Sequence, residues 1–415
     1  MRSRARWGGT ASRLTLRDAG YDDGVSRSPV IVAAARTPFG RLGGGLASVP
    51  AVQLGAKAIR EVVTRAGVEP GEVDQVIMGT VLPAGQGQVP ARQAALAAGI
   101  PPTVSAMTIN KVCASALKAV NLGALLINAG EADVVVAGGM ESMSQAPYLL
   151  QDQRFGARFG DRIAVDSMMH DGLCCPVDGV LMGVHGSDVA AELGVSREQQ
   201  DEWSYRSQMR YQDALAAGRF AEEVISVGVN GHTVERDEQP RADTTLEKLA
   251  ALRPAFGEGS TITAGNAPGM NDGATAVVLM SAERAAASGL APLGHWVAYG
   301  EAAREHPYLA TVPALALENA MAKTRGEVLA DRLALVEINE AFAAVAITST
   351  RMLEVDPEIV NVNGGAIAVG HPIGASGARI LMTLLYELRR RGGGYGGAGI
   401  CSGIAQGEAT LVRVD

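Results

Sequence analysis

Apolar residues along this chain form short continuous runs that are separated by longer stretches with helical spacing. The run at residues 133–140, DVVVAGGM, is rich in β-branched residues and ends in glycines, which predicts a strand buried on both faces. Just before it, residues 114–128 place Leu117, Val120 and Ala124 three or four positions apart, which predicts a helix with an apolar face. The order of helix, turn and buried strand is typical of an α/β protein.

The same order recurs near the C-terminus. An apolar helix is expected from residue 375 to 391, followed by a strand and a glycine-rich turn at 397–407, GAGICSGIAQG. Residues 73–81, VDQVIMGTV, match residues 333–342, LALVEINEAF, in the same relative place. The chain therefore resembles two copies of one α/β unit, and two facing halves would form a shared cleft where α/β proteins usually bind ligands.

The pattern changes between the two copies. Residues 146–271 contain an amphipathic helix at 196–217, charged loops and several prolines, which predicts an inserted domain over the cleft. The expected organisation is then an N-terminal half at 28–145 together with about 272–293, the inserted domain, and a C-terminal half at 294–415.

Composition adds limits to this picture. A chain of 415 residues is too long for one core, and 51 glycines with only 4% aromatic residues indicate closely packed helices and many turns. A net charge of -8 argues against a general affinity for nucleic acid or anionic membranes, and no run approaches the roughly 18 apolar residues of a membrane span. Residues 1–27, rich in arginine, are expected to be a disordered extension.

The chain has four cysteines, at positions 113, 174, 175 and 401. They are too few and too unevenly spaced for a disulfide framework, which favours a reducing, cytoplasmic location. Cys174 and Cys175 lack partners at zinc spacing and the six histidines are scattered, so no metal site is expected.

Cys113 lies in the stretch NKVCASALKA, at the expected start of a helix. Free backbone N–H groups and the helix dipole favour negative charge there, which would lower the pKa of the thiol and produce a reactive thiolate. A buried, inert cysteine is the other interpretation of this stretch.

Three further stretches carry candidate chemistry. His371 lies in NGGAIAVGHPIGASGAR, where the small residues indicate backbone that approaches a ligand closely. Cys401 and Gly403 lie in GICSGIAQG, whose free N–H groups would suit an oxyanion site, and Asn339 begins NEAFAA, where its amide could hold a water. Taken singly, a structural histidine, a core cysteine and a helix-capping asparagine remain open.

Together, and in this order, NKVCASALKA, GGMESMS, NEAFAA, NVNGGAIAVGHPIGASGAR and GICSGIAQG resemble the thiolase family. The similarity runs from about Ser28 to the C-terminus. It implies a five-layered α-β-α-β-α core made of two similar halves with an inserted loop domain, and coenzyme A thioesters as substrates. It also implies a homodimer or homotetramer and no separate cofactor.

The resemblance assigns roles by position. Cys113 matches the nucleophile that takes the acyl group, His371 the base that activates it, and Cys401 the second acid/base. Asn339 matches the residue whose water forms one oxyanion hole with His371. The N–H groups of Cys113 and Gly403 match the other hole.

Other positions match the segments that bind coenzyme A in the family. They are Met182, Arg241, Lys248, Ala264, Pro268 and Phe342. Pro268 replaces a serine that is common in thiolases, and Leu181 replaces a histidine of many short-chain members. A solvated charged face is the other interpretation of Arg241 and Lys248.

The predicted function is the interconversion of two acetyl-CoA, or of acyl-CoA plus acetyl-CoA, with 3-ketoacyl-CoA and coenzyme A. Two alternatives remain. A cysteine hydrolase would also use Cys113 and His371 but gives no reason for Cys401. A non-catalytic acyl-CoA or lipid carrier would be expected to have lost the nucleophile or the base.

Overall fold

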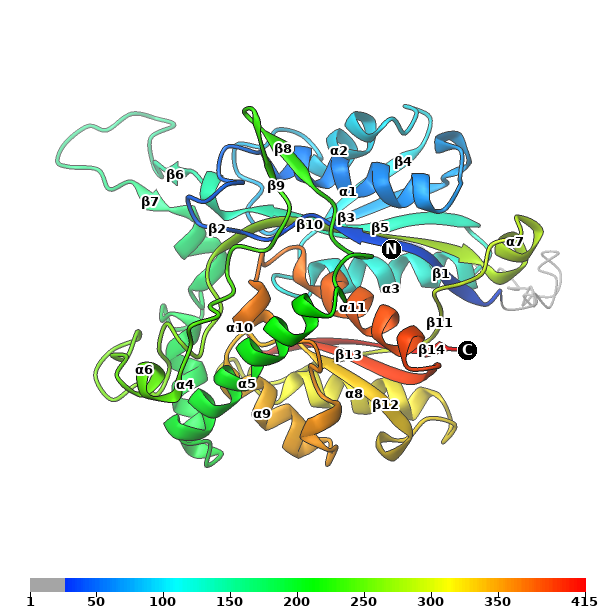
Figure 1. The fold of residues 1–415 in the computed structure, drawn as a ribbon. Helices are drawn as coiled ribbons and strands as arrows, with labels where there is room; N and C mark the ends of the chain where they lie inside the picture. The colour runs from blue at the N-terminus through cyan, green and yellow to red at the C-terminus, as the bar shows by residue number, and fades with distance from the viewer. Residues whose placement is uncertain (1–26) are drawn as a thin grey trace, which may run out of the picture.

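The computed structural model describes residues 27–415, so the prediction for the N-terminal extension falls almost entirely outside the described residues. The described chain has five layers (Figure 1). The helical layers are α1 (Ala51–Arg65) with α2 (Pro90–Ala98), then α3 (Ser115–Asn128) with α11 (Ser376–Arg390), then α8 (Val312–Lys323) with α9 (Ala343–Met352). The predicted α/β fold with a five-layered α-β-α-β-α core is confirmed.

Ten strands make the two sheet layers between these helices. The first half has the order β1 (Pro29–Arg36), β10 (Asn271–Ser281), β5 (Val134–Ser142), β3 (Gln75–Gly79) and β4 (Ser105–Ile109), with β2 (Gly40–Arg41) beside β10. The second half has the order β11 (Gly294–Ala303), β14 (Gln406–Val414), β13 (Gly394–Ser402) and β12 (Leu333–Ile338). A short antiparallel contact between β1 and β11 joins the halves.

The strand pairing shows that the halves are copies of one unit. The order β1-β10-β5-β3 in the first half corresponds to β11-β14-β13-β12 in the second. In each, the last pair is parallel and the other two pairs are antiparallel. The expected repeat, including the match of residues 73–81 with 333–342, is therefore present in the fold.

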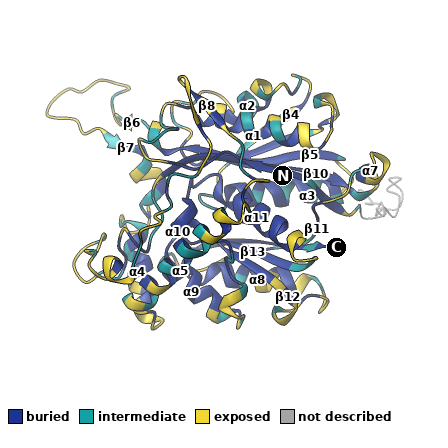
Figure 2. Ribbon diagram, viewed as in Figure 1, coloured by how far each residue is buried: buried dark blue, intermediate teal, exposed yellow. Residues whose placement is uncertain are grey.

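Burial follows from this layering. Every residue of β5 and β10 is buried, as expected for strands covered by helices on both faces (Figure 2). Helix α11 is buried from Ser376 to Leu388, because it lies between the sheets and packs against α3. The contact is close: a Cβ on Gly377 would lie 2.5 Å from the backbone nitrogen of Leu117.

The inserted segment consists of helices and small hairpins around one end of the core. It contains β6 (Tyr148–Leu149), β7 (Val165–Asp166), a π-helix (Met168–Leu173), α4 (Met182–Glu192), α5 (Arg197–Ala216), β8 (Val227–Val229), β9 (His232–Val234) and α6 (Leu246–Ala250). Ser196 and Gln199 form a capping box at the start of α5, which fixes the predicted amphipathic helix. Short helices α7 (Ala282–Ala287) and α10 (Ala366–Val369) complete the fold.

Helix α5 contacts α9 and α10 of the second half, whereas the β6–β7 segment extends away from the core (Figure 1). Within the described residues, no helix combines the length and apolar character needed to cross a membrane.

Candidate active site

A cavity of about 400 Å³ lies where the two halves meet the inserted segment. The residues of interest that line it are Cys113, His371, Cys401 and Gly403. Most of the remaining wall is apolar and includes Met143, Leu173, Leu181, Phe256, Leu309 and Ile373. Residues from both halves and from the insertion therefore line one largely apolar cavity.

The Cys113 turn is held against the turn that follows Cys401. The hydroxyl of Ser402 donates a 2.5 Å hydrogen bond to the carbonyl oxygen of Lys111, two residues before Cys113. A Cβ added to Gly403 would lie 3.2 Å from a methyl of Val112, so the two turns are in close contact. The positions of the two sulfurs are thus coupled through the backbone.

Both turns contain strained backbone. Val112 has a φ of 43°, and Ile404 and Ala405, directly after Gly403, have φ values of 58° and 45°. Left-handed conformations are unfavourable for such side chains, and above all for β-branched valine and isoleucine. Such strain persists only where surrounding contacts impose it, and it concentrates at functional sites.

The thiol of Cys113 is protonated in this environment. Burial, with a smaller contribution from nearby Glu141, raises its pKa to about 12, and a hydrogen bond from the residue's own backbone only partly opposes this. The expectation that the helix start lowers the pKa is therefore wrong, because desolvation outweighs the dipole. Burial and the proximity of Cys113 also raise the pKa of Cys401 well above its ordinary value.

His371 is oriented by its own chain. Its backbone N–H donates to Asn271 Oδ1 at 2.8 Å. The preceding residue, Gly370, has a φ of 110°, and the side chain of Asn271 leaves no space for a Cβ there. Nδ1 lies 2.6 Å from Ser376 Oγ, whose proton points to the carbonyl of Pro372 at 2.9 Å. Because Ser376 donates elsewhere, we assign the imidazole proton to Nδ1.

The other ring nitrogen is then free to accept a proton. Nε2 of His371 is buried and has no hydrogen-bond partner among the described residues. Burial, with a smaller contribution from Arg379, lowers the pKa of His371 to about 3, so the ring is neutral at physiological pH. His371 lines the same cavity as the two thiols.

The glycines that follow His371 serve packing rather than ligand approach. A Cβ on Gly374 would lie 2.5 Å from a carboxylate oxygen of Glu141, and Gly377 lies against Leu117. Neither Gly374 nor Gly377 lines the cavity. The interpretation of these glycines as a surface for ligand approach is therefore wrong, since their small size allows α11 and its preceding loop to pack on the first half.

Asn339 follows β12, is fully buried and is not among the residues that line the cavity. Neither atom of its amide has a partner in the described part of the chain. Buried amides normally bind protein groups or ordered water, so this side chain is suited to holding a water molecule. The next residue, Glu340, accepts hydrogen bonds from Trp203 and Ser207 of α5, which fixes the loop against the insertion.

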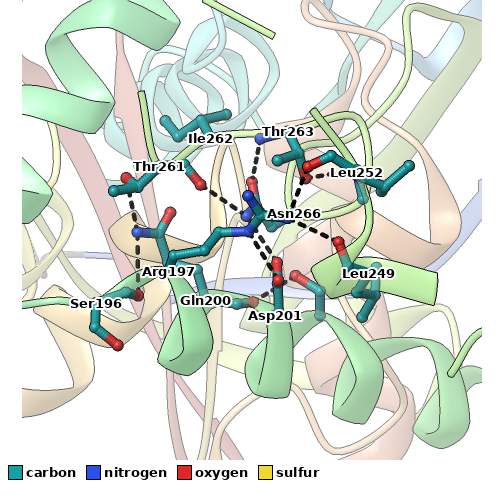
Figure 3. A network of polar contacts seen from close by, with 12 residues as sticks. Ser196, Arg197, Gln200, Asp201, Leu249, Leu252, Thr261, Ile262, Thr263 and Asn266 are labelled. Atoms are coloured by element: carbon teal, nitrogen blue, oxygen red, sulfur yellow. Dashed lines mark hydrogen bonds and ion pairs between the residues drawn. The ribbon is translucent and has the colours of Figure 1, made fainter. Parts of the chain in front are cut away.

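A polar network holds the inserted loop that forms part of the wall (Figure 3). Asn266 donates to Asp201 at 3.0 Å and to the carbonyl of Thr261 at 3.1 Å, and its oxygen accepts from the Thr263 N–H. Arg197 pairs with Asp201 at 2.8 Å and donates to the Leu249 carbonyl (Figure 3). Residues 264–268 are consequently fixed beside the cavity.

The expected coenzyme-binding residues divide into two groups. Those that line the cavity are Met182, Arg241, Ala264, Pro268 and Phe342. Arg241 donates from its guanidinium to the Ala264 carbonyl at 3.1 Å. Lys248 instead is exposed, bonds Asp243 at 2.6 Å and does not line the cavity, so its role stays a prediction.

Sequence reasoning missed three residues that position the site: Ser376, Ser402 and Glu141. All three lie inside motifs quoted above: Ser376 is five residues after His371, Ser402 directly follows Cys401, and Glu141 lies in GGMESMS. This position was the available signal. Glu141 is buried, and its carboxylate accepts from the N–H groups of Val81, Leu82 and Gly374. It thereby connects the first half to the loop that follows His371.

Comparison with known families agrees with this geometry. Residues 29–283 match the model of the thiolase N-terminal domain, and residues 290–414 match the thiolase C-terminal domain. The chain belongs to the thiolase family.

Curated relatives match this thiolase over almost their whole length. An acetyl-CoA acetyltransferase of Cupriavidus necator is 49% identical over 389 residues, which cover 92% of this chain and 98% of the relative. The protein of the same name from Escherichia coli K12 is 47% identical, again with 92% and 98% covered. That of Shinella zoogloeoides is 46% identical, with 94% of this thiolase and 100% of the relative covered.

Proposed function

We propose that this thiolase is an acyl-CoA:acetyl-CoA C-acyltransferase. It interconverts two acetyl-CoA, or acyl-CoA plus acetyl-CoA, with 3-ketoacyl-CoA and coenzyme A through an acyl-Cys113 thioester. The observation that carries the proposal is the single cavity shared by Cys113, His371 and Cys401. The names of the three relatives support acetyl-CoA as a substrate.

In the degradative direction, His371 Nε2 removes the proton of Cys113 and the thiolate attacks the 3-keto carbon. The bond between C2 and C3 breaks, the acyl group stays on Cys113, and the departing acetyl-CoA carbanion equivalent takes a proton from Cys401. Coenzyme A then gives its thiol proton to the Cys401 thiolate and attacks the acyl-enzyme. Acyl-CoA leaves, and the Cys113 sulfur takes back the proton held by His371. The raised pKa of Cys401 suits its role as proton donor, because its sulfur carries the proton that the carbanion takes. The raised pKa of Cys113 means that His371 must remove its proton for the attack to occur.

Two developing negative charges need separate stabilisation. The N–H groups of Cys113 and Gly403 are proposed to bind one oxyanion, and His371 with a water on Asn339 the other. The apolar wall excludes solvent, and such dipoles are worth more in a medium of low dielectric constant.

Coenzyme A is proposed to pass between Arg241 and Phe342, with Lys248 at its nucleotide end. No separate cofactor is required, because the thioester itself supplies the acyl group and the leaving thiol. Pro268 offers neither an N–H nor a hydroxyl to the pantetheine arm, so contacts there are apolar.

We also propose a cytoplasmic homodimer or homotetramer. On the β6–β7 segment, Phe155 and Phe159 are each 93% exposed and Ile163 is 81% exposed, which favours contact with a second copy. The four free cysteines fit a reducing compartment.

The Cys401→Ala variant provides the decisive test. It is expected to form acetyl-Cys113 from acetyl-CoA, seen by mass spectrometry, while carbon–carbon bond formation and cleavage are lost. Full turnover by this variant would overturn the role of Cys401. A chain that accepts no acetyl group removable by Cys113→Ser would favour the carrier, and hydrolysis of the acyl-enzyme without transfer to coenzyme A would favour the hydrolase.

A further inference from the structure

A group of metal-ligating side chains lies outside the reacting centre, between the insertion and the second half. The Cys175 cluster consists of Cys175, Asp178, His185 and His306. The sequence has no partners for Cys175 at zinc spacing, but the fold brings α4 and a distant loop to it.

Local backbone geometry prepares the first three ligands. The Cys175 N–H donates to the Val180 carbonyl at 2.8 Å, and the Gly179 N–H donates to the Cys175 carbonyl at 2.9 Å. This tight turn places the side chains of Cys175 and Asp178 together, and α4 presents His185 from its first turn. The ligand atoms of the three residues all lie within 4.8 Å of one another.

The fourth side chain comes from the β11–α8 loop. His306 Nε2 lies 3.2 Å from Asp178 Oδ2, and His185 Nε2 lies 2.6 Å from the same oxygen. The two imidazole ring centres are 5.3 Å apart. Two imidazoles directed at one carboxylate oxygen, with a thiol alongside, form a mixed sulfur, nitrogen and oxygen donor set.

We propose that the Cys175 cluster binds a divalent transition-metal ion of the zinc type, with its four side chains as ligands. Tetrahedral zinc with bonds of about 2.0–2.3 Å separates its ligand atoms by about 3.3–3.8 Å, so side-chain shifts of about 1 Å are enough. A thiolate and a carboxylate balance the two charges of the ion. Cys175 is buried and Asp178 is exposed, which leaves a solvent path for the metal.

The Asp178 carboxylate is positioned to bind a cation. Asp178 Oδ1 accepts from the Val180 N–H at 3.4 Å, and Asp178 Oδ2 lies 2.6 Å from His185 Nε2 and 3.2 Å from His306 Nε2. On binding, the thiol of Cys175 loses its proton to solvent, and the proton on His185 moves to Nδ1, which has no partner among the described residues. Binding therefore releases one proton from the cluster.

The site would connect two parts of the cavity wall. Leu181 and Met182 line the cavity just before His185, and Leu309 lines it just after His306. A metal in the Cys175 cluster would fix these segments to each other. Because all four ligands come from the protein, its role is structural and it takes no part in acyl transfer.

The test uses the full-length chain with the Cys113→Ser substitution. The nucleophilic sulfur of the active site then cannot bind the Zn²⁺ or Co²⁺ ions used as probes. We expect about one Zn²⁺ per chain by elemental analysis after gel filtration. With Co²⁺, we expect a sulfur-to-metal charge-transfer band. Cys175→Ser should abolish that band, and His306→Gln should weaken Zn²⁺ binding at least about tenfold.

Cys174→Ser is the matched control, because Cys174 is adjacent but contacts the Cys175 carbonyl rather than the cluster. It should bind Zn²⁺ as the parent does, and Zn²⁺ should raise the melting temperature of both but not of Cys175→Ser. Absence of stoichiometric Zn²⁺ from the parent, or equally tight binding by Cys175→Ser and His306→Gln, would overturn the proposal. If a variant fails to fold, the Co²⁺ spectrum of the parent still tests the proposal, because the sulfur-to-metal charge-transfer band is expected only if a cysteine binds the ion.

Discussion

The hydroxyl of Ser402 donates a 2.5 Å hydrogen bond to the carbonyl of Lys111, and this contact joins two segments that are remote in sequence. It couples the strand that carries Cys401 to the turn that carries Cys113. The relative placement of the two sulfurs therefore depends on a side chain that belongs to neither.

Ser402→Ala removes this link. We expect a loss of about 1 kcal/mol in the free energy of unfolding and a larger fall in carbon–carbon bond formation than in acetylation of Cys113. Denaturant unfolding and single-turnover acetylation measure the two effects. Ser167→Ala is the control, since Ser167 also donates to a backbone carbonyl, at 2.6 Å, but lies outside the cavity lining. Equal losses in both half-reactions would contradict the coupling.

The raised pKa of Cys113 predicts an unusual pH profile for alkylation. Because this pKa is about 12, the thiolate fraction should rise about tenfold per pH unit up to pH 10, without the plateau of a free cysteine near its pKa of about 8.5. The rate with iodoacetamide, followed on the peptide that contains Cys113, measures this. A plateau below pH 9 would show that the helix start does stabilise the thiolate.

Ser376 sets the proton position on His371. Ser376→Ala removes the oxygen that accepts from Nδ1, so both tautomers become populated and kcat should fall about tenfold, with little change in KM. Nitrogen NMR of the imidazole distinguishes the tautomers, and a purely structural role for Ser376 would leave that spectrum unchanged. A single Nδ1–H tautomer in the variant would contradict the assignment.

Replacement of Glu141 by glutamine should destabilise the protein. In Glu141→Gln, the new NH₂ group faces backbone N–H donors whichever way it turns, since Oε1 accepts from Leu82 and Oε2 from Val81 and Gly374. We expect a loss of about 1–3 kcal/mol in the free energy of unfolding and reduced turnover. The exposed pair of Glu61 with Arg65 offers the comparison, where Glu61→Gln should cost about 0.5 kcal/mol or less.

The sequence predicted the secondary structure well where the spacing of apolar residues over a few positions decides which element forms. The apolar run at 133–140 predicted a covered strand, and the spacing of Leu117, Val120 and Ala124 predicted a helix. The structure contains both, as β5 and α3. The repeat of those patterns gave the two halves. The family motifs then identified Cys113, His371, Cys401 and Gly403, which the structure brings to one cavity.

Electrostatics could not be predicted in the same way. The helix start near Cys113 was visible in the sequence, but the groups that bury the thiol come from both halves and the insertion. Desolvation is a sum over everything that surrounds a group, and that sum exists only after folding. The direction of the Cys113 pKa was therefore predicted wrongly from a correct local feature.

By itself, the sequence determined which elements form and that they form twice, because hydrophobic periodicity and glycine turns act over a few residues. The side chains proposed to carry the chemistry came from the resemblance of its motifs to the thiolase family. Only the tertiary structure decided the protonation of those side chains, the burial of His371 Nε2 and the meeting of Asp178 with His306. Each of these depends on atoms that are distant along the chain and become neighbours through packing of the layers.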